Sequence, residues 1–438
     1  MVTDGCSSIN YNEINEMMIS ARNIADQSKI LYNATKLNDL GIRLRFLAAR
    51  QIEESISGVF PKAEACIFGS SVNGYGKLGC DLDLILQLES ESAESKDDLT
   101  KRLVFHTKKQ LINPRSQIQR DLENLSETMH IYLPGVSHVR KILQARVPIV
   151  RYHHEYLDLE VDLSINNMSG VYMSELLYMF TQIDERVSPL VFSIRRWAQL
   201  VGVTNPTPGN WISNFSLTCL VIFYLQQLSN PVLPPINSFV QQARPEDNRN
   251  SGEAGLQCCF LRDLNSFKFA RENTDTIDHL LMGFFEFYSE MKFSENAISL
   301  NDAKLHIKPN SSPVYIINPL EQSLNVTKNM SFEECERFRV EVRNAVWSLE
   351  STEKRQTASD RSKAWGLLNL FRAQGKSSIQ AQSFYKPRMV ELDGILGDKS
   401  KNRSGDNVPI KNQSVKAALS KIKKKSRADL KEMKLNDR

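Results

Sequence analysis

The sequence predicts an α+β protein in which a small mixed sheet accompanies a mostly helical part. Strand-like apolar runs are concentrated between residues 65 and 165, and the first two of them flank a Gly-Ser pair. Much of the remaining chain up to about residue 350 repeats apolar residues at spacings of three and four, which is typical of amphipathic helices. With 438 residues, the chain is long enough for two to three domains with sizeable cores.

The composition is that of an ordinary globular protein. Hydrophobic residues make up 41% of the chain and charged residues 24%. The sequence contains no uninterrupted apolar run of about 18 residues, so we expect no membrane span. Its seven cysteines form no Cys-x-x-Cys pair, which favours free thiols in a reducing compartment.

The net charge of +4 conceals an asymmetry along the chain. Residues 399–438 contain 13 Lys and Arg and 4 Asp and Glu, so this tail carries +9 and the remaining body −5. The tail has too few apolar residues to fold by itself, and we expect it to be disordered. Its basic run from Lys421 to Arg427 either attracts RNA through counterion release or is simply solvated.

The elements are expected in the following order. Residues 10–57 are predicted to be helical, and Pro61 ends that pattern. We then expect strands at 65–68 and 82–86; a loop at 89–101; a helix at 116–129; strands at 136–143, 147–152 and 157–165; helices at 172–180, 187–201 and 213–228; a mobile loop at 231–255; helices at 276–292 and 332–350; an extended segment at 313–319; and a loop at 376–382.

Two histidines, His153 and His154, follow the second of the three later strands. An adjacent His pair can form part of a metal site, but at a hairpin tip a solvated turn is the simpler interpretation. Neighbouring residues of a strand also face opposite sides of the sheet, so both rings rarely reach one ion.

The strongest chemical signal is a Gly-Ser pair followed by an Asp-x-Asp pattern. In a strand, Asp81 and Asp83 would point to one side while Leu82 and Leu84 enter a core. Carboxylates, together with substrate phosphates, are the ligands that Mg²⁺ prefers. A Gly-Ser pair at a helix start can bind phosphate through free N–H groups. Each motif alone is common and says little; their order and spacing carry the prediction.

A third carboxylate, Asp162, lies on the polar side of an alternating strand, Leu159 to Ile165. Beside a strand that carries Asp81 and Asp83 it becomes a third metal ligand or a base. Three carboxylates around two Mg²⁺ ions are the arrangement that in-line nucleotidyl transfer uses.

This layout resembles the nucleotidyltransferases of the DNA polymerase β superfamily, and within it most closely the mitochondrial poly(A) polymerases. The resembling segments cover most of residues 36–350: 36–47, 68–83, 139–148, 174–178, 191–195, 211–217 and 311–325. The resemblance implies a palm-like catalytic domain at 58–168, packed on a helical poly(A)-polymerase-associated domain at 169–385, with the active-site cleft between them. Residues 1–57 would then be helices packing partly on the helical domain, and 386–438 a basic tail.

The resemblance also implies the reaction and its cofactors. Asp81, Asp83 and Asp162 would bind two Mg²⁺ or Mn²⁺ ions. Asp162 would also help to deprotonate the 3′-hydroxyl of an RNA, which attacks the α-phosphate of ATP while pyrophosphate leaves.

Nucleotide contacts are carried over position by position from the resemblance. They are Gly69 and Ser70 for the β- and γ-phosphates, Asn167 for the ribose 2′-hydroxyl, Arg195 for the triphosphate, Asn214 and Phe215 for the base, and Ser174 and Leu324. A second basic position, one helical turn after Arg195, is Gln199 here, which leaves part of the triphosphate charge without a partner. An aromatic residue such as Phe215 on a buried helix is more often part of a core.

Base choice depends on residues 318–325, which resemble the nucleotide-recognition loop of the family. Uridylyl-adding relatives have a histidine immediately before the last Asn, where this chain has Leu324. An apolar side chain cannot make that hydrogen bond, so we expect ATP rather than UTP. The alternatives are a core role for Leu324 with another group choosing the base, a terminal uridylyltransferase or mixed-nucleotide enzyme, and an inactive relative that only binds RNA.

A mitochondrial location and a homodimer are further implications of the resemblance. Members of the family carry a leader and an N-terminal RNA-binding-like domain that supports dimerisation. The first 20 residues here contain Asp4, Glu13 and Glu16 and no arginine, unlike an intact leader. We therefore expect a processed form, a shortened isoform or a divergent homologue.

Overall fold

The computed structural model describes residues 5, 9–88, 113–207, 209–249, 256, 258–353 and 364–372. All of them belong to one unit that extends to Ser377. The loop predicted at 89–101, the loop at 376–382 and the basic tail at 386–438 lie outside the described residues. In the part of the chain that is described, no helix is both long enough and apolar enough to cross a membrane.

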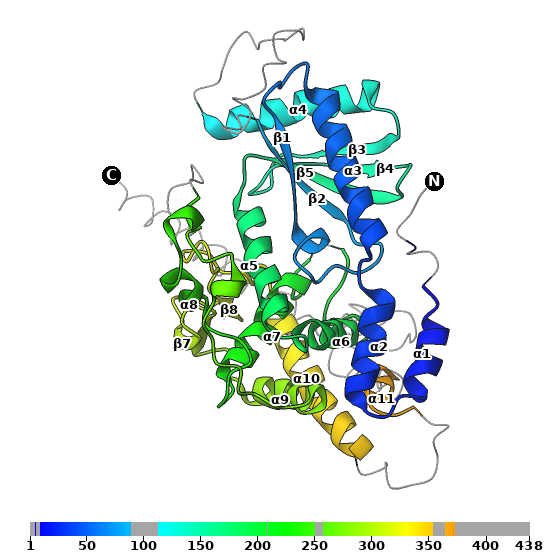
Figure 1. Cartoon of the computed structure of the whole chain (residues 1–438), viewed down its shortest axis with the longest axis vertical. Helices are drawn as coiled ribbons and strands as arrows, with labels where there is room; N and C mark the ends of the chain where they lie inside the picture. The colour runs from blue at the N-terminus through cyan, green and yellow to red at the C-terminus, as the bar shows by residue number, and fades with distance from the viewer. Residues whose placement is uncertain are drawn as a thin grey trace, which may run out of the picture. The chain divides into compact units, whose positions relative to one another are not determined.

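A five-stranded mixed sheet forms the first layer, as predicted (Figure 1). Its strands are β1 (Glu64–Phe68), β2 (Leu82–Gln87), β3 (Val136–Ile142), β4 (Ile149–His154) and β5 (Leu159–Ile165), in the order β1-β2-β5-β4-β3. Strands β2 and β5 run parallel, and the other neighbours are antiparallel. The parallel pair places the Asp-x-Asp strand directly beside the strand of Asp162.

One face of this sheet is covered by two helices, α3 (Asp39–Ile56) and α4 (Pro114–Tyr132). Alternate residues of the strands turn toward them, including Leu82 and Leu84 of β2, which are fully buried in the shared apolar cluster. The predicted alternation of β2 is therefore confirmed. The intervening residues, Asp83 among them, point to the opposite face.

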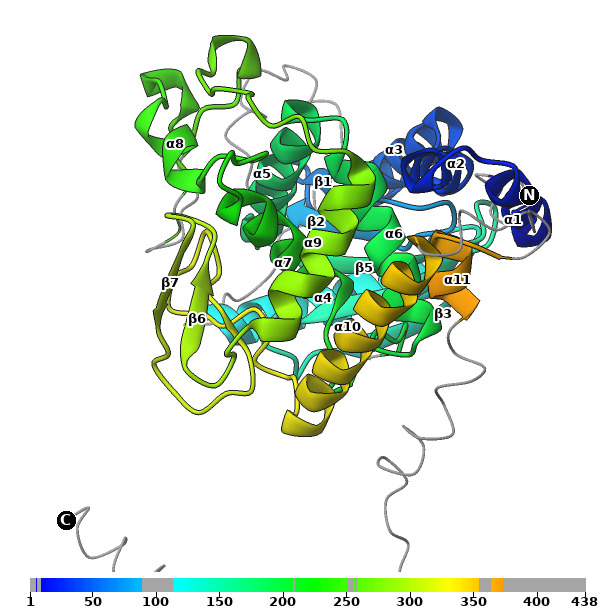
Figure 2. The same cartoon turned by 90° about the horizontal axis from the view of Figure 1, so that it is seen from below.

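The second apolar core belongs to the helical part. Figure 2 shows the helices of this part. Its helices are α1 (Tyr11–Ile19), α2 (Ile24–Thr35), α5 (Ser169–Ile183), α6 (Val187–Leu200), α7 (Asn214–Gln227), α8 (Ile236–Gln241), α9 (Ile277–Glu290), α10 (Phe332–Glu353) and α11 (Leu367–Arg372). Helix α7 is buried from Ser216 to Gln226 without a break, so it occupies the centre of this core. A three-stranded sheet of β6 (Asn296–Ser299), β7 (Lys304–Ile307) and β8 (Tyr315–Ile316) adjoins the helices.

The helical region predicted at 10–57 consists of three helices. Each begins after an asparagine whose side chain accepts backbone N–H groups of the first turn: Asn10, Asn23 and Asn38. Helices α1 and α2 contribute to the helical core, whereas α3 packs on the sheet. The chain therefore passes from one core to the other between Thr35 and Asp39.

Two expectations about loops are wrong. The region 231–255, expected to be a mobile loop, contains α8, and Phe239 of that helix is fully buried in the helical core. His153 and His154 do not form a solvated turn, because both belong to β4. As the period of the strand requires, they face opposite sides: His153 lies near Glu160, while His154 is 3% exposed and its ring contacts Gln51 of α3.

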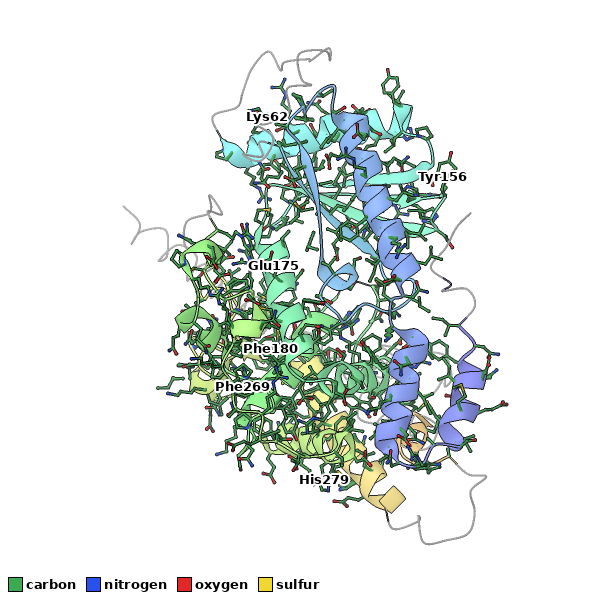
Figure 3. All side chains as sticks on the ribbon, viewed as in Figure 1. Lys62, Tyr156, Glu175, Phe180, Phe269 and His279 are labelled. Atoms are coloured by element: carbon green, nitrogen blue, oxygen red, sulfur yellow. The ribbon has the colours of Figure 1, made fainter. Side chains whose placement is uncertain are left out.

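Helix α5 connects the sheet to the helical core, and Figure 3 labels Glu175 and Phe180 along it. Near its start, Gly170 lies so close to the Phe68 ring that an added Cβ would be 2.6 Å from it. Phe180, three turns further on, is fully buried among the helices. Glu175 accepts a hydrogen bond from Arg262 at 2.9 Å. One rigid helix thus fixes the end of β1 to the helical part.

Candidate active site

Three carboxylates, two on neighbouring strands and one directly before the first of them, define the site. Asp83 of β2 and Asp162 of β5 are direct partners in the parallel register, so their side chains emerge on the same face. Asp81 lies one residue before β2. The structure therefore places the three acidic residues singled out in the sequence close enough for their charges to interact, beside the loop that follows Gly69 and Ser70.

The electrostatics of this group show an excess of negative charge. Burial, together with the charges of Asp162 and Asp81, raises the pKa of Asp83 to about 7, and Arg151 offsets only part of this. Burial and the charge of Asp162 also raise the pKa of Asp81. The charge of Asp162 therefore makes the ionised forms of Asp81 and Asp83 less favourable.

Arg151 of β4 is a site residue that the sequence analysis missed. Its Nε and Nη2 donate to the two carboxylate oxygens of Asp162, each at 2.6 Å, and the two residues are direct cross-strand partners. This two-point hydrogen bond raises the pKa of Arg151 above its usual value. In the sequence, the alternation of β4 places Arg151 on the polar face. Its pairing with Asp162 follows only from the register of β4 and β5.

The acidic group fits a divalent cation by donor type and by charge. Carboxylate oxygens are hard ligands, and a cation would stabilise the ionised form of Asp83 that the neighbouring charges disfavour. Within the described ranges, no three His, Cys, Asp or Glu side chains converge closely enough to hold an ion. Both oxygens of Asp162 are bonded to Arg151. For Asp162 to serve as a ligand, at least one of those bonds must be given up.

The Gly-Ser pair forms a short 3-10 turn, η2 (Gly69–Ser71), between β1 and β2. Gly69 has φ +71°, and a Cβ on it would lie 2.2 Å from Oδ2 of Asp83, so this position requires glycine. Its N–H donates to the hydroxyl of Ser174 at 2.8 Å, and that hydroxyl donates to the carbonyl of Gly170. Ser174 therefore ties the turn to α5 from a buried position.

The loop from Val72 to Cys80 is held by two arginines. The buried side chain of Arg45, on α3, donates to the carbonyls of Gly41 and Cys80, the residue before Asp81. Arg195, on α6, donates to the carbonyl of Tyr75 at 2.9 Å. Arg45 was not among the predicted site residues. Both cations fix the backbone between the Gly-Ser turn and the first aspartate.

Among the described residues, no carboxylate pairs with Arg195. Its Nε and Nη2 donate to Thr218 of α7, at 3.1 and 2.5 Å, and burial lowers its pKa to about 10. The hydroxyl of Thr218 in turn donates to the carbonyl of Asn214. Asn214 is exposed at the start of α7, and Phe215 is only partly buried against the helical core. Phe215 thus contacts the core without being enclosed by it.

Asn167, the predicted ribose contact, lies between β5 and α5. Its side-chain oxygen accepts a hydrogen bond from Ser169 at 2.6 Å. Its side chain is half-buried and follows Asp162 by five residues, at the end of the strand.

The segment 318–325 is a structured loop next to β8. Asn325 accepts the N–H of Ile316 and donates to the carbonyl of Val314, and the N–H of Leu324 donates to Glu321. The side chain of Leu324 is partly exposed and belongs to neither apolar cluster. The alternative of a core role for Leu324 therefore finds no support in its packing.

Comparisons with known proteins point to one family. A family model described as "Poly(A) RNA polymerase, mitochondrial-like, central palm domain" matches residues 24–182. The mitochondrial poly(A) RNA polymerase of Drosophila melanogaster is 49% identical over 442 residues, covering 98% of this chain and 72% of that protein. The human mitochondrial poly(A) RNA polymerase is 37% identical over 392 residues, covering 89% of this chain and 67% of that protein.

Solved structures show the same fold. The crystal structure of mtPAP in complex with ATPγS matches with a TM-score of 0.76 and 36% identity, covering 83% of this chain and 75% of that one. Structures of mtPAP in complex with GTP, UTP and CTP match equally well. The Cid1 poly(U) polymerase, at 20% identity and a TM-score of 0.61, shares the fold.

Proposed function

This chain belongs to the family of mitochondrial poly(A) RNA polymerases, and on that premise we propose that it adds AMP from ATP to the 3′ ends of RNA without a template. The observation that carries the proposal is the direct pairing of Asp83 with Asp162 on neighbouring strands, with Asp81 beside them. This is the donor set that nucleotidyl transfer needs at its reacting phosphate.

The side chains of the site would have the following roles. Asp81, Asp83 and Asp162 would hold the metal ions, Mg²⁺ or Mn²⁺; bound there, such ions neutralise charge on the phosphates and lower the pKa of the attacking hydroxyl. The RNA 3′-oxygen attacks the α-phosphorus of ATP, its proton passes to Asp162, and the bond to the pyrophosphate oxygen breaks. Because Asp162 is paired with Arg151, this role requires Arg151 to release one carboxylate oxygen.

Positioning of ATP would fall to groups around this centre. We assign Gly69 and Ser70 to the β- and γ-phosphates and Asn167 to the ribose, as the family resemblance implies. Arg195 supplies a partly buried positive charge that pairs with no carboxylate among the described residues, which suits a triphosphate. Phe215 and Asn214 stand at the exposed start of α7, where a base can stack.

Further features come from the relatives. We propose a mitochondrial location, because the relatives of 49% and 37% identity are named for it. A homodimer is proposed from the family resemblance alone. We also keep the boundaries 58–168 for the catalytic domain and 169–385 for the helical domain, with the addition that α3 packs on the catalytic sheet.

A second candidate is a tailing enzyme that also uses UTP or several nucleotides. The observation that favours it is that mtPAP has been solved in complex with GTP, UTP and CTP, so a relative binds nucleotides with other bases. Leu324 argues for ATP, since its partly exposed side chain offers no hydrogen bond to a uracil.

The test is extension of an oligo-RNA with Mg²⁺ and each nucleoside triphosphate separately. We expect ATP to be used best; dominant extension with UTP would overturn the choice of base. Asp162→Ala should abolish extension, by at least about 10³-fold, while RNA affinity is largely kept. Glu155→Gln, which removes an exposed carboxylate from the β4–β5 turn, is the control. A wild-type protein that binds RNA but extends nothing would establish the inactive alternative.

A further inference from the structure

A row of charged side chains crosses the face of the five-stranded sheet that lies opposite α3 and α4. The strand registers pair Asp83 with Asp162, Asp162 with Arg151, and Arg151 with Arg140, so one residue from each of β2, β5, β4 and β3 stands in line. Directly paired residues share a face, and here it is the face opposite α3 and α4. We call these four residues the charged row. It runs from two carboxylates to two guanidinium groups.

The outer end of the charged row combines two like charges. Arg140 is exposed on β3, which is the edge strand of the sheet. Like charges directly opposite each other in a sheet are destabilising. Arg151 is balanced by Asp162, whereas the nearby Glu160 lies against His153 at 3.3 Å. Arg140 thus stands beside a second guanidinium group, and a bound anion would offset the repulsion that remains between the two.

The other end of the charged row is closed by protein. Phe68 of β1 is the register partner of Asp83, and Gly170 of α5 packs against its ring. Gly69, next in the chain, lies against the carboxylate of Asp83. A polymer whose end reaches Asp162 therefore cannot continue along the row beyond β1. Along the row, the open direction is toward β4 and β3.

We propose that Arg140, as the outermost member of the charged row, binds the phosphate backbone of the RNA just upstream of its 3′ end. The inference rests on the proposed function, because it takes the 3′-hydroxyl to lie at Asp162. Neighbouring strands are about 4.8 Å apart, so β3 lies about 10 Å from β5. A long arginine side chain at that distance reaches the nucleotides that directly precede the terminal one.

The chain provides a matched control in the next residue. Lys141 carries the same charge but points to the opposite face, where its ammonium donates to Glu127 of α4 at 2.5 Å. Its register partner, Val150, is fully buried in the core beneath that face. Neutralising Lys141 changes the net charge as much as neutralising Arg140, without touching the charged row.

The experiment measures the affinity of the full chain for a labelled oligo(A) RNA, without ATP, across a series of salt concentrations. We expect Arg140→Gln to weaken binding severalfold and to reduce the slope of log affinity against log salt by about 0.7, the loss of one phosphate contact. Lys141→Gln should leave the slope unchanged, and Arg140→Lys should restore most of it. In extension assays, Arg140→Gln should raise the KM for RNA with little effect on the KM for ATP.

Equal slopes for Arg140→Gln and the wild type, or the same loss in Lys141→Gln, would overturn the assignment of Arg140. Binding is measured without turnover, so the result is independent of the reaction. A wild type that extends no RNA while its affinity still depends on Arg140 would reject the proposed function and keep the phosphate contact. If the wild type extends RNA but its RNA affinity does not depend on Arg140, the proposed function is kept and the phosphate contact is rejected.

Discussion

Asp83 shows why this site needs a positively charged ligand. Its pKa is raised to about 7 by burial first and then by the charges of Asp162 and Asp81. A carboxyl in that environment is partly protonated at neutral pH, and a protonated carboxyl is a poor metal ligand and a poor partner for a cation. Divalent cations therefore favour the ionised form of Asp83, and binding them releases protons.

Gly69 is a position at which the site has no room for a side chain. In Gly69→Ala, the new Cβ would lie 2.2 Å from Oδ2 of Asp83, at a φ of +71° that L-residues rarely adopt. We expect the carboxylate to be displaced and kcat for adenylyl transfer to fall by roughly 10²-fold, with the fold retained by circular dichroism. Gly58→Ala, where nothing lies within 4 Å of the added atom, should be active. A fully active Gly69→Ala would contradict the close packing against Asp83.

Leu324 tests the choice of base. Replacing it with histidine adds a hydrogen-bond donor at a partly exposed position whose backbone is fixed by Glu321 and Asn318. We expect Leu324→His to raise the ratio of UTP to ATP incorporation by about 10-fold or more, measured as relative kcat/KM. Leu324→Phe supplies an apolar ring of comparable size without the donor and should not change the ratio. Identical ratios in both variants would show that another group selects the base.

Among single residues, the sequence could predict the site residues that the local pattern of the chain identifies. Asp81, Asp83 and Asp162 are recognisable because strands alternate and because a carboxylate on a polar face stands out. Arg151 and Arg45 are not recognisable in this way. Arg151 affects the site because it bonds to Asp162, eleven residues away. Arg45 affects it because it bonds to the carbonyl of Cys80, in the loop before β2. Both partnerships depend on tertiary register, which local periodicity does not encode.

At the scale of elements, the loop between η2 and β2 is held by three helical regions at once. The junction of α2 and α3 bonds to it through Leu37 and Thr35, α3 through Arg45, and α6 through Arg195. Gly76 permits this crowding, because a Cβ there would meet the carbonyl of Ser70 at 2.2 Å. The Gly-Ser turn and Asp81 therefore keep their places through contacts from both apolar cores.

An ion pair joins the β3–β4 turn to the loop of Leu324. Nη2 of Arg146 lies 2.9 Å from each carboxylate oxygen of Glu321, and Arg115 of α4 supports the turn by bonding its carbonyls. The pair is partly exposed, so we expect it to contribute at most about 1 kcal/mol. Arg146→Glu should raise the KM for ATP by about 5- to 10-fold, because repulsion replaces attraction across the two elements.

The double reversal, Arg146→Glu with Glu321→Arg, should restore most of the KM, and high salt should reduce the difference between the single variants and the wild type. Steady-state kinetics with ATP in a charge-swap cycle measures this coupling. If the two reversals are additive, the ion pair does not position the loop.

The elements that the sequence missed are short or depend on tertiary contacts. Strands β6 and β7 have four residues each, and β7 is exposed throughout, so neither gives a clear alternation. Helix α8 follows a Pro-rich stretch that suggests a loop, and only the burial of Ile236 and Phe239 shows why it is ordered. The longer helices α4, α7, α9 and α10 were predictable because apolar spacing over many residues outweighs local exceptions.

At the scale of the molecule, the sequence predicted a sheet part and a helical part but not the route of the chain between them. The N-terminal helices divide, with α1 and α2 in the helical core and α3 on the sheet. Helix α11 returns near the N-terminus, where Trp365 donates to Ile19 and Gln27 accepts from Leu367. These contacts join residues more than 300 positions apart, and no local pattern predicts them.

The charge asymmetry of the whole chain leads to the last prediction. Residues 399–438 carry +9 while the rest carries −5, so the part that holds the acidic site repels RNA at long range and the tail attracts it. Deleting 399–438 should weaken oligo-RNA binding strongly at low salt and little at high salt, lowering the salt slope by about 2 if three cations reach phosphates. A full-length variant with the Lys and Arg residues of 421–427 changed to Gln controls for chain length and should show part of the same loss. An equal loss of affinity at every salt concentration would mean that the tail does not act through its charge.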